Sequence, residues 1–165
     1  MDSRSVLLAN AAATAALGAE LAQLWLRQPA NGEPQILLLE GTLGAGKTSL
    51  VQGIAVALGI EEPITSPSFA LAQHYGGRRQ GRATALVHLD LYRLEQAAAA
   101  EELFAQEEEE ARALGALMAV EWPGRLRFEP EGAWRVELQL LDPQHPEAGR
   151  RALLRLPSDA PAAPQ

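Results

Sequence analysis

The chain has 165 residues, a length that suits a single domain built around one core. Its formal net charge of −7 disfavours a direct electrostatic grip on nucleic acid, because an acidic surface repels phosphate backbones. It has no cysteine, which excludes disulfides, thiolate metal sites and a cysteine nucleophile. We therefore expect a protein as the macromolecular partner and a reducing, cytoplasmic location.

The first part of the chain predicts a short strand over residues 6–8 and a helix over residues 11–27, with Asn10 as its N-cap. The alanine-rich stretch here could be misread as a secretory signal, but Asn10 and Thr14 interrupt it. The longest later apolar run, at residues 116–120, is far too short to span a membrane. We expect no contact with a membrane.

An apolar run at residues 36–39 is typical of a strand buried on both faces, and it leads directly into a glycine-rich segment. A helical pattern follows over residues 47–58, with Gly59 placed to end it. A strand, a loop and a helix therefore follow one another without interruption.

The remaining segments complete an α/β pattern. Apolar or alternating segments predict a hairpin at 69–75 and 84–89, a buried strand at 117–120, and a second, more exposed hairpin at 134–140 and 151–156. Residues 97–114 are helical by composition, and the glutamate run at 107–110 is expected to be a solvated helical face. We expect a single domain over residues 1–156 and a disordered tail over residues 157–165.

The glycine-rich segment fits the pattern G-x-x-x-x-G-K-[ST], and its residues are Gly41, Thr42, Leu43, Gly44, Ala45, Gly46, Lys47 and Thr48. Glycines let the backbone curl so that successive N–H groups converge on phosphate oxygens, and the following helix adds its positive N-terminal end. Lys47 can reach the β and γ phosphates, Thr48 can ligate Mg²⁺, and Ser49 can bond a phosphate nearer the sugar. The alternative is a glycine-rich turn without a ligand. The context predicts a P-loop NTPase fold, in which a central, mostly parallel but mixed sheet has helices on both faces.

Two acidic residues are candidates for the carboxylates that a magnesium nucleotide site requires. Asp90 follows the apolar run 86–89, and Glu121 follows the run 117–120. Parallel sheets bring such positions together at the C-terminal ends of their strands. Asp90 could hold a magnesium-bound water, while Glu121 could orient the attacking water or hold the metal itself. Lys47, Asp90 and Glu121 are the candidate catalytic residues, and either acid could instead cap a turn.

A hydroxyl-rich loop follows the phosphate-loop helix and consists of Thr65, Ser66, Pro67 and Ser68. Its position is suitable for a switch-like loop that the γ-phosphate orders and that hydrolysis releases. An ordinary turn is the alternative.

These features together resemble the bacterial TsaE family, also called YjeE, the ATPase of tRNA threonylcarbamoyladenosine biosynthesis. The resemblance covers about residues 10–125. It rests on the phosphate loop and on the segments Thr65-Ser66-Pro67-Ser68-Phe69, His88-Leu89-Asp90-Leu91-Tyr92-Arg93-Leu94 and Val120-Glu121-Trp122-Pro123. The chain departs from the family between Leu94 and Leu114, which puts partner contacts from that region in doubt.

The resemblance implies that Thr48 and Glu121 ligate Mg²⁺, that Asp90 is an acid of the same site, and that residues 65–68 form the switch-like loop. It also implies that Trp122 lies beside the nucleotide and that Ala11 is the contact on the adenine side. The implied partners are the transferase TsaD and its companion TsaB, with tRNA contacted indirectly through their complex.

Three functions remain open from the sequence. The first is a magnesium-dependent ATPase, slow alone, whose nucleotide cycle resets a tRNA-modifying complex. The second is a small P-loop kinase, which requires an arginine-bearing lid and an acceptor pocket. The third is a nucleotide-gated binding module in which hydrolysis is incidental.

Overall fold

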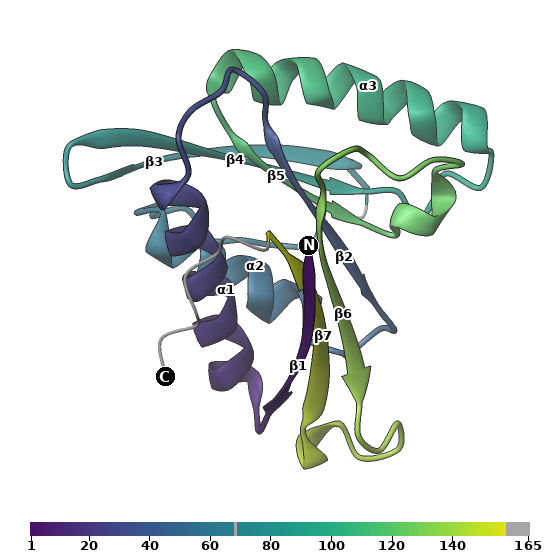
Figure 1. The fold of residues 1–165 in the computed structure, drawn as a ribbon. Coiled ribbons are helices and arrows are strands. Elements are labelled where there is room, and N and C mark those ends of the chain that lie inside the picture. The colour runs from purple at the N-terminus through teal and green to yellow at the C-terminus, as the bar shows by residue number, and fades with distance from the viewer. Residues whose placement is uncertain (68, 158–165) are drawn as a thin grey trace.

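The computed structural model describes residues 1–67 and 69–157. Within these residues, one seven-stranded sheet carries helices on both of its faces (Figure 1). In chain order the elements are β1 (Asp2–Leu8), α1 (Ala11–Arg27), β2 (Gln35–Gly41), α2 (Lys47–Ala57), β3 (Ala72–Arg79), β4 (Arg82–Asp90), α3 (Ala97–Leu114), β5 (Leu117–Glu121), a 3₁₀ turn (Pro123–Arg125), β6 (Trp134–Leu140), a second 3₁₀ turn (Pro146–Ala148) and β7 (Arg150–Leu156).

The order of strands across the sheet is β1-β7-β6-β2-β5-β4-β3. The pairs β6–β2, β2–β5 and β5–β4 are parallel, and the outer pairs β1–β7, β7–β6 and β4–β3 are antiparallel. The expected α/β class with a mixed sheet is confirmed. Because β2, β4 and β5 are parallel neighbours, their C-terminal ends meet at one edge.

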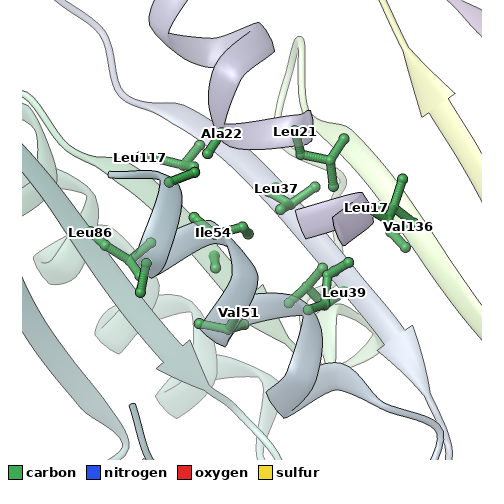
Figure 2. Close-up of a cluster of buried hydrophobic side chains, with 14 of the residues drawn as sticks. Leu17, Leu21, Ala22, Leu37, Leu39, Val51, Ile54, Leu86, Leu117 and Val136 are labelled. Carbon is green, nitrogen blue, oxygen red and sulfur yellow. The ribbon is translucent and has the colours of Figure 1, made fainter. Parts of the chain in front are cut away.

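Alternation along β2 explains why its sequence is a continuous apolar run. Leu37 and Leu39 face the core under α1 and α2, while Ile36 and Leu38 face the core under α3. Figure 2 shows the first of these cores, where side chains from α1, α2 and the sheet pack together. A strand buried on both faces in this way needs no polar positions.

The helices α1 and α2 approach until their backbones touch. A Cβ atom added to Gly53 would lie 1.9 Å from Ala15 O, and one added to Gly18 would lie 2.1 Å from Leu50 O. Any side chain at these two positions would therefore separate the helices.

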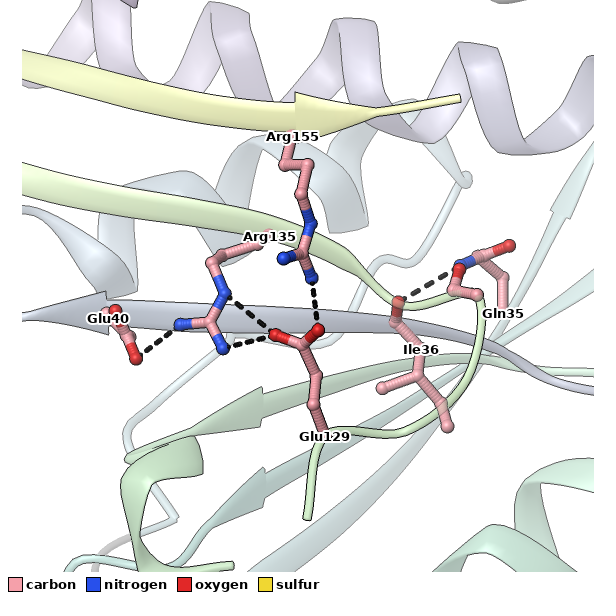
Figure 3. A network of polar contacts seen from close by, with 7 residues as sticks. Gln35, Ile36, Glu40, Glu129, Arg135 and Arg155 are labelled. Atoms are coloured by element: carbon pink, nitrogen blue, oxygen red, sulfur yellow. Dashed lines mark hydrogen bonds and ion pairs between the residues drawn. The ribbon is translucent and has the colours of Figure 1, made fainter. Parts of the chain in front are cut away.

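An ion-pair network joins β6 and β7 to the loop before β6 and to β2 (Figure 3). Glu129 Oε1 lies 2.6 Å from Arg135 Nη2, and Glu129 Oε2 lies 2.8 Å from Arg155 Nη2. Arg135 Nη1 also lies 2.5 Å from Glu40 Oε1. The hydrogen bonds from Arg155 and Arg135 lower the pKa of Glu129 below its ordinary value. The carboxylate of Glu129 therefore holds these strands together in its ionised form.

Two of the predicted helices have the bounds expected from the sequence, 11–27 and 97–114. Asn10 accepts a hydrogen bond from Ala13 N at 2.9 Å, which confirms it as the N-cap of α1. The helix α2 begins at Lys47 as predicted and ends at Ala57, and Gly59 follows with a φ of 73°. The predicted short strand at 6–8 is part of the longer β1.

Two predictions were wrong in detail. Phe69 does not belong to a strand: it lies in a turn, is 86% exposed, and β3 begins only at Ala72. The second predicted hairpin forms as β6 and β7 and alternates, as expected, between buried positions and partly or fully exposed ones, although Trp134 at its start is fully buried. Glu107 is buried rather than solvated, and it pairs with His74 of β3 at 2.6 Å. The predicted tail lies outside the described residues from residue 158 onward.

Candidate functional site: a phosphate loop facing two carboxylates

The glycine-rich segment forms a tight loop between β2 and α2. Ala45 N donates to Thr42 O at 3.1 Å, and Leu50 N donates to Gly46 O at 3.0 Å as the first turn of α2 closes. Gly46 is the N-cap residue, with φ 109° in the left-handed region. A Cβ at this position would lie 2.7 Å from Arg150 Nη1, so both the backbone and the neighbouring side chain require glycine.

The loop borders a cavity of about 710 Å³ at the C-terminal ends of β4 and β5. Most of the predicted site residues line it: Ala11, Leu43, Gly44, Gly46, Lys47, Thr48, Ser49, Ser66, Asp90, Glu121 and Trp122. Gly41 and Thr42 instead line a second hollow of about 550 Å³ on the β6 side of Lys47 and Trp122. Ala45 is completely buried and lines neither. Thr65 and Pro67 do not line the first cavity, and Ser68 lies outside the described residues.

Lys47, Glu121 and His88 form a line of contacts beside the loop. Lys47 Nζ lies 3.7 Å from Glu121 Oε1, and His88 Nε2 lies 2.5 Å from Glu121 Oε2. All three side chains are at least nine-tenths buried. Both oxygens of Glu121 are therefore engaged, and His88 proves to be a buried structural partner of this acid.

Asp90 lies directly opposite Glu121 in the register of β4 and β5. Burial raises the pKa of Asp90, helped by the nearby charge of Glu121, although a hydrogen bond from Tyr92 N at 3.0 Å opposes the rise. For Glu121 burial also acts upward, but the hydrogen bond and charge of His88 and the charge of Lys47 outweigh it and lower the pKa. Of the two carboxylates in this site, Asp90 therefore holds a proton more readily than an ordinary aspartate, and Glu121 less readily than an ordinary glutamate.

Trp122 covers the lysine at the cavity wall. Lys47 Nζ lies 4.6 Å from the centroid of its ring, a cation–π distance. Tyr92 packs on the same indole with ring centroids 4.7 Å apart. Trp122 adopts φ 60° and ψ 50°, a conformation that few non-glycine residues take and that turns its side chain toward the site.

Sequence reasoning missed Arg150 as a residue of this site. It is the first residue of β7, is 7% exposed, and lines the same cavity as Lys47. Its Nη1 donates to Ala45 O of the loop at 3.0 Å across 105 positions of sequence. Only the position of β7 in the sheet reveals this contact, since no local motif marks the residue.

The donor atoms at the cavity are suitable for Mg²⁺. Thr48 and the two acids Asp90 and Glu121 line this cavity, and Mg²⁺ prefers hard oxygen ligands such as hydroxyl and carboxylate groups. In the part of the chain that the structure describes, no cluster of three or more His, Cys, Asp or Glu side chains is arranged for a metal. P-loop proteins do not require one, because the nucleotide phosphates and water complete the shell.

A strand, a phosphate loop and a helix within a mixed sheet covered on both faces define the P-loop NTPase class. The family described as "Threonylcarbamoyl adenosine biosynthesis protein TsaE" matches residues 8–151. The chain belongs to this TsaE family.

Individual relatives agree with this assignment. Similar proteins named tRNA threonylcarbamoyladenosine biosynthesis protein TsaE occur in Nostoc sp. (43% identity over 58% of this chain and 56% of the relative), Synechocystis sp. (46% over 62% and 64%) and Treponema pallidum (38% over 66% and 76%). The chain thus spans little more than half the length of the Nostoc relative. The crystal structure of Bacillus subtilus YdiB has a similar fold, with a TM-score of 0.60 at 23% identity over 93% of this chain and 84% of that one.

Within residues 1–67 and 69–157, no helix combines the length and the apolar character needed to cross a membrane.

Proposed function

We propose that this chain is a magnesium-dependent ATPase of tRNA threonylcarbamoyladenosine biosynthesis, slow alone and acting in the cytoplasm with partners of the TsaD and TsaB type. The convergence of Lys47, Thr48, Asp90 and Glu121 on one phosphate-loop cavity is the observation that carries this proposal. Membership of the TsaE family supports the pathway. The tRNA is then contacted through the partners, in agreement with the acidic net charge of −7.

The site provides a role for each residue. Backbone N–H groups of the loop and Lys47 hold the β and γ phosphates, while Thr48 and Glu121 hold Mg²⁺. Bound Mg²⁺ offsets the charge of the phosphate oxygens. Glu121 suits a metal ligand because its lowered pKa keeps it ionised. Asp90 orients a water, whose oxygen attacks the γ phosphorus as the bond to the β–γ bridging oxygen breaks, giving ADP, phosphate and a proton.

Ala11 and Trp122 line the same cavity. Ala11 begins α1 and lines the cavity, and the family supports its role as the contact on the adenine side, through its backbone and its packing. Trp122 closes the side next to Lys47. Ser66 is the described residue of the switch-like loop that lines the cavity.

Two variants test the ATPase proposal. Lys47→Ala is expected to abolish binding of Mg-ATP, because it removes the ammonium group that balances the phosphates. Glu121→Ala is expected to retain measurable binding and to lose turnover, because it removes a ligand that acts in the transition state. Calorimetry measures the first effect and phosphate release the second, with Glu109→Ala on the exposed face of α3 as the control. Phosphate release by Glu121→Ala at the parental rate would contradict its role.

A nucleotide-gated binding module is the second candidate, and one contact favours it. Arg93 lines the cavity, and its guanidinium lies 4.3 Å from the ring of Phe69, which is 86% exposed. A change at the nucleotide can therefore reach an exposed aromatic side chain next to the switch-like loop. Phosphate release measured with and without the TsaD and TsaB partners separates the two candidates: stimulation favours the ATPase, whereas association that depends on ATP without turnover favours the module.

A further inference from the structure

Arg150 has the features of a charged residue that lacks its counter-ion. The side chain is 7% exposed and lines the phosphate-loop cavity. Its Nη1 donates to Ala45 O at 3.0 Å and its Nη2 to Pro146 O at 3.3 Å. Its Nε is buried and has no hydrogen-bond partner among residues 1–67 and 69–157.

Within the described part of the chain, no carboxylate pairs with this charge. The half-buried arginine of the adjoining strand, Arg135, pairs with Glu40 and Glu129. Arg150 is absent from the ion pairs that the described residues form. Burying a guanidinium group without an anion is costly, since each ion loses its hydration on entering the protein.

The surroundings of Arg150 add further positive potential. The guanidinium lies against Gly46, the N-cap of α2, so it faces the positive end of the helix dipole. Lys47 begins the same helix and lines the same cavity. Glu121 offsets the charge of Lys47, whereas Arg150 has no such counter-ion among the described residues, so an anion bound in this cavity would supply the charge that Arg150 lacks.

The hydrogen bond to Ala45 O also has a geometric effect. In a planar trans peptide the C=O and the following N–H point in opposite directions. Arg150 holds the carbonyl of Ala45 on its own side, so the N–H of Gly46 is directed away from it. This contact fixes one of the N–H groups with which a phosphate loop binds its anion.

We propose that Arg150 is a positioning residue and second cation of the polyphosphate site. It holds the Ala45–Gly46 peptide in its binding orientation, and the bound nucleoside polyphosphate supplies the missing negative charge. The inference rests on the proposed function, because it requires that the loop binds a nucleotide.

The test compares Arg150→Gln, Arg150→Lys and the parent protein in calorimetric titrations with Mg-ATP and Mg-ADP. We expect Arg150→Gln to weaken binding of both nucleotides about 10-fold or more, the loss expected for a charge-assisted contact. Arg150→Lys keeps the charge but loses the planar fork, so its affinity is expected to fall between those of the parent and Arg150→Gln. Arg151→Gln is the matched control, because its side chain lies on the opposite face of β7 and is partly exposed.

The thermal midpoint of the nucleotide-free proteins distinguishes this role from a merely structural one. Removing a buried, uncompensated charge leaves the midpoint of Arg150→Gln unchanged or raises it, while nucleotide affinity falls. Parental affinity in Arg150→Gln, or a fall in midpoint that accounts for the lost affinity, would overturn the inference. If Arg150→Gln does not fold, parental affinity in Arg150→Lys overturns it and weakened affinity at an unchanged midpoint supports it. Failure of the parent itself to bind Mg-ATP would instead overturn the proposed function.

Discussion

Glu121 shows how a single side chain acquires its role from its neighbours. One oxygen lies beside Lys47 and the other accepts a hydrogen bond from the fully buried His88. The carboxylate is thus fixed in orientation as well as in charge. Residues behind a metal ligand commonly change metal affinity or activity by about 10- to 100-fold when they are removed.

His88→Leu is expected to lower phosphate release about 10- to 100-fold, because Glu121 loses the group that orients it. Binding of the nucleotide without Mg²⁺ should change little, since His88 does not line the cavity. His88→Gln is the matched control, since it keeps a hydrogen-bond donor at this position and should retain more activity. Equal activity of the leucine variant and the parent would exclude a positioning role for His88.

Trp122 is expected to report on nucleotide binding through its fluorescence. Its ring contacts Lys47, and the ammonium group must turn toward the phosphates when a nucleotide binds. Trp134 is fully buried in the core and lines neither hollow beside the loop. Addition of Mg-ATP should therefore change the emission of the parent protein but not that of Trp122→Phe. A response that persists in Trp122→Phe would assign the signal to another tryptophan.

Among single residues, the sequence predicted those that belong to a recognisable motif, and it missed Arg150, which belongs to none. Asp90 and Glu121 each follow an apolar run, and Lys47 belongs to the motif that follows a third run, so parallel pairing of the three strands predicts that they meet; the structure brings them to one cavity. Arg150 lies one residue before the segment expected to be a strand. Its contact with Ala45 depends on the register of β7 against β6, which local patterns do not encode.

At the scale of elements, the packing of α1 on α2 depends on two glycines. A methyl group on Gly53 would overlap the carbonyl of Ala15, which belongs to the backbone and cannot rotate away. Gly53→Ala is therefore expected to lower the free energy of unfolding by about 3 kcal/mol, the upper part of the range for overpacked cores. Gly76→Ala is the control, since a Cβ atom added at that position would meet nothing within 4 Å. Denaturant titration measures both, and equal midpoints would show that the helices can separate at little cost.

The network of Glu129 gives the sheet a specific response to acid. Its pKa is lowered from an ordinary value of 4.5, so its stabilising effect is fully present above pH 4.5 and is lost as the pH falls through the lowered value. Glu129→Gln should therefore be less stable than the parent at neutral pH and should lose less stability on acidification. Solvent screening of this 42% exposed side chain limits the difference to less than about 1 kcal/mol. Thermal midpoints between pH 7 and pH 3 measure it, and parallel curves would exclude the effect.

Elements with strong local sequence signals were predicted well. Features that depend on contacts with other elements of the chain were not. The bounds of α1 and α3 follow from Asn10 and Gly115, a side-chain cap and a left-handed C-terminal residue. The strand β3 was placed three residues too early, because Phe69 is apolar but packs against Arg93 at the surface. The burial of Glu107 depends on His74, which approaches from another element.

For the whole molecule, the sheet gathers the candidate site at one of its edges. The central parallel strands bring the phosphate loop and both carboxylates to one edge, whereas the antiparallel outer strands extend the sheet on either side. The sequence predicted this class of architecture from a strand, loop and helix around one motif. It could not predict the strand order, because β6 returns to pair with β2 after a separation of about a hundred residues.

Binding of Mg-ATP should stabilise the whole fold. A ligand that binds only the native state at 100 times its Kd raises the free energy of unfolding by about 2.7 kcal/mol. The thermal midpoint of the parent should rise accordingly, and removal of Mg²⁺ with EDTA should reduce the shift. Lys47→Ala is the control that should show no shift with or without the metal. An equal rise in Lys47→Ala would mean that the nucleotide binds elsewhere.

The contact between the backbones of α1 and α2 has a mechanical consequence. The first turns of both helices, at Ala11 and Lys47, lie beside the phosphate-loop cavity, and the contacts at Gly18 and Gly53 hold the two helix backbones close together. We therefore expect the two first turns to keep a nearly constant spacing when a ligand binds. Any movement during a nucleotide cycle is then expected to involve Ser66, Asp90 and Arg93, which line the same cavity from loops and a strand end.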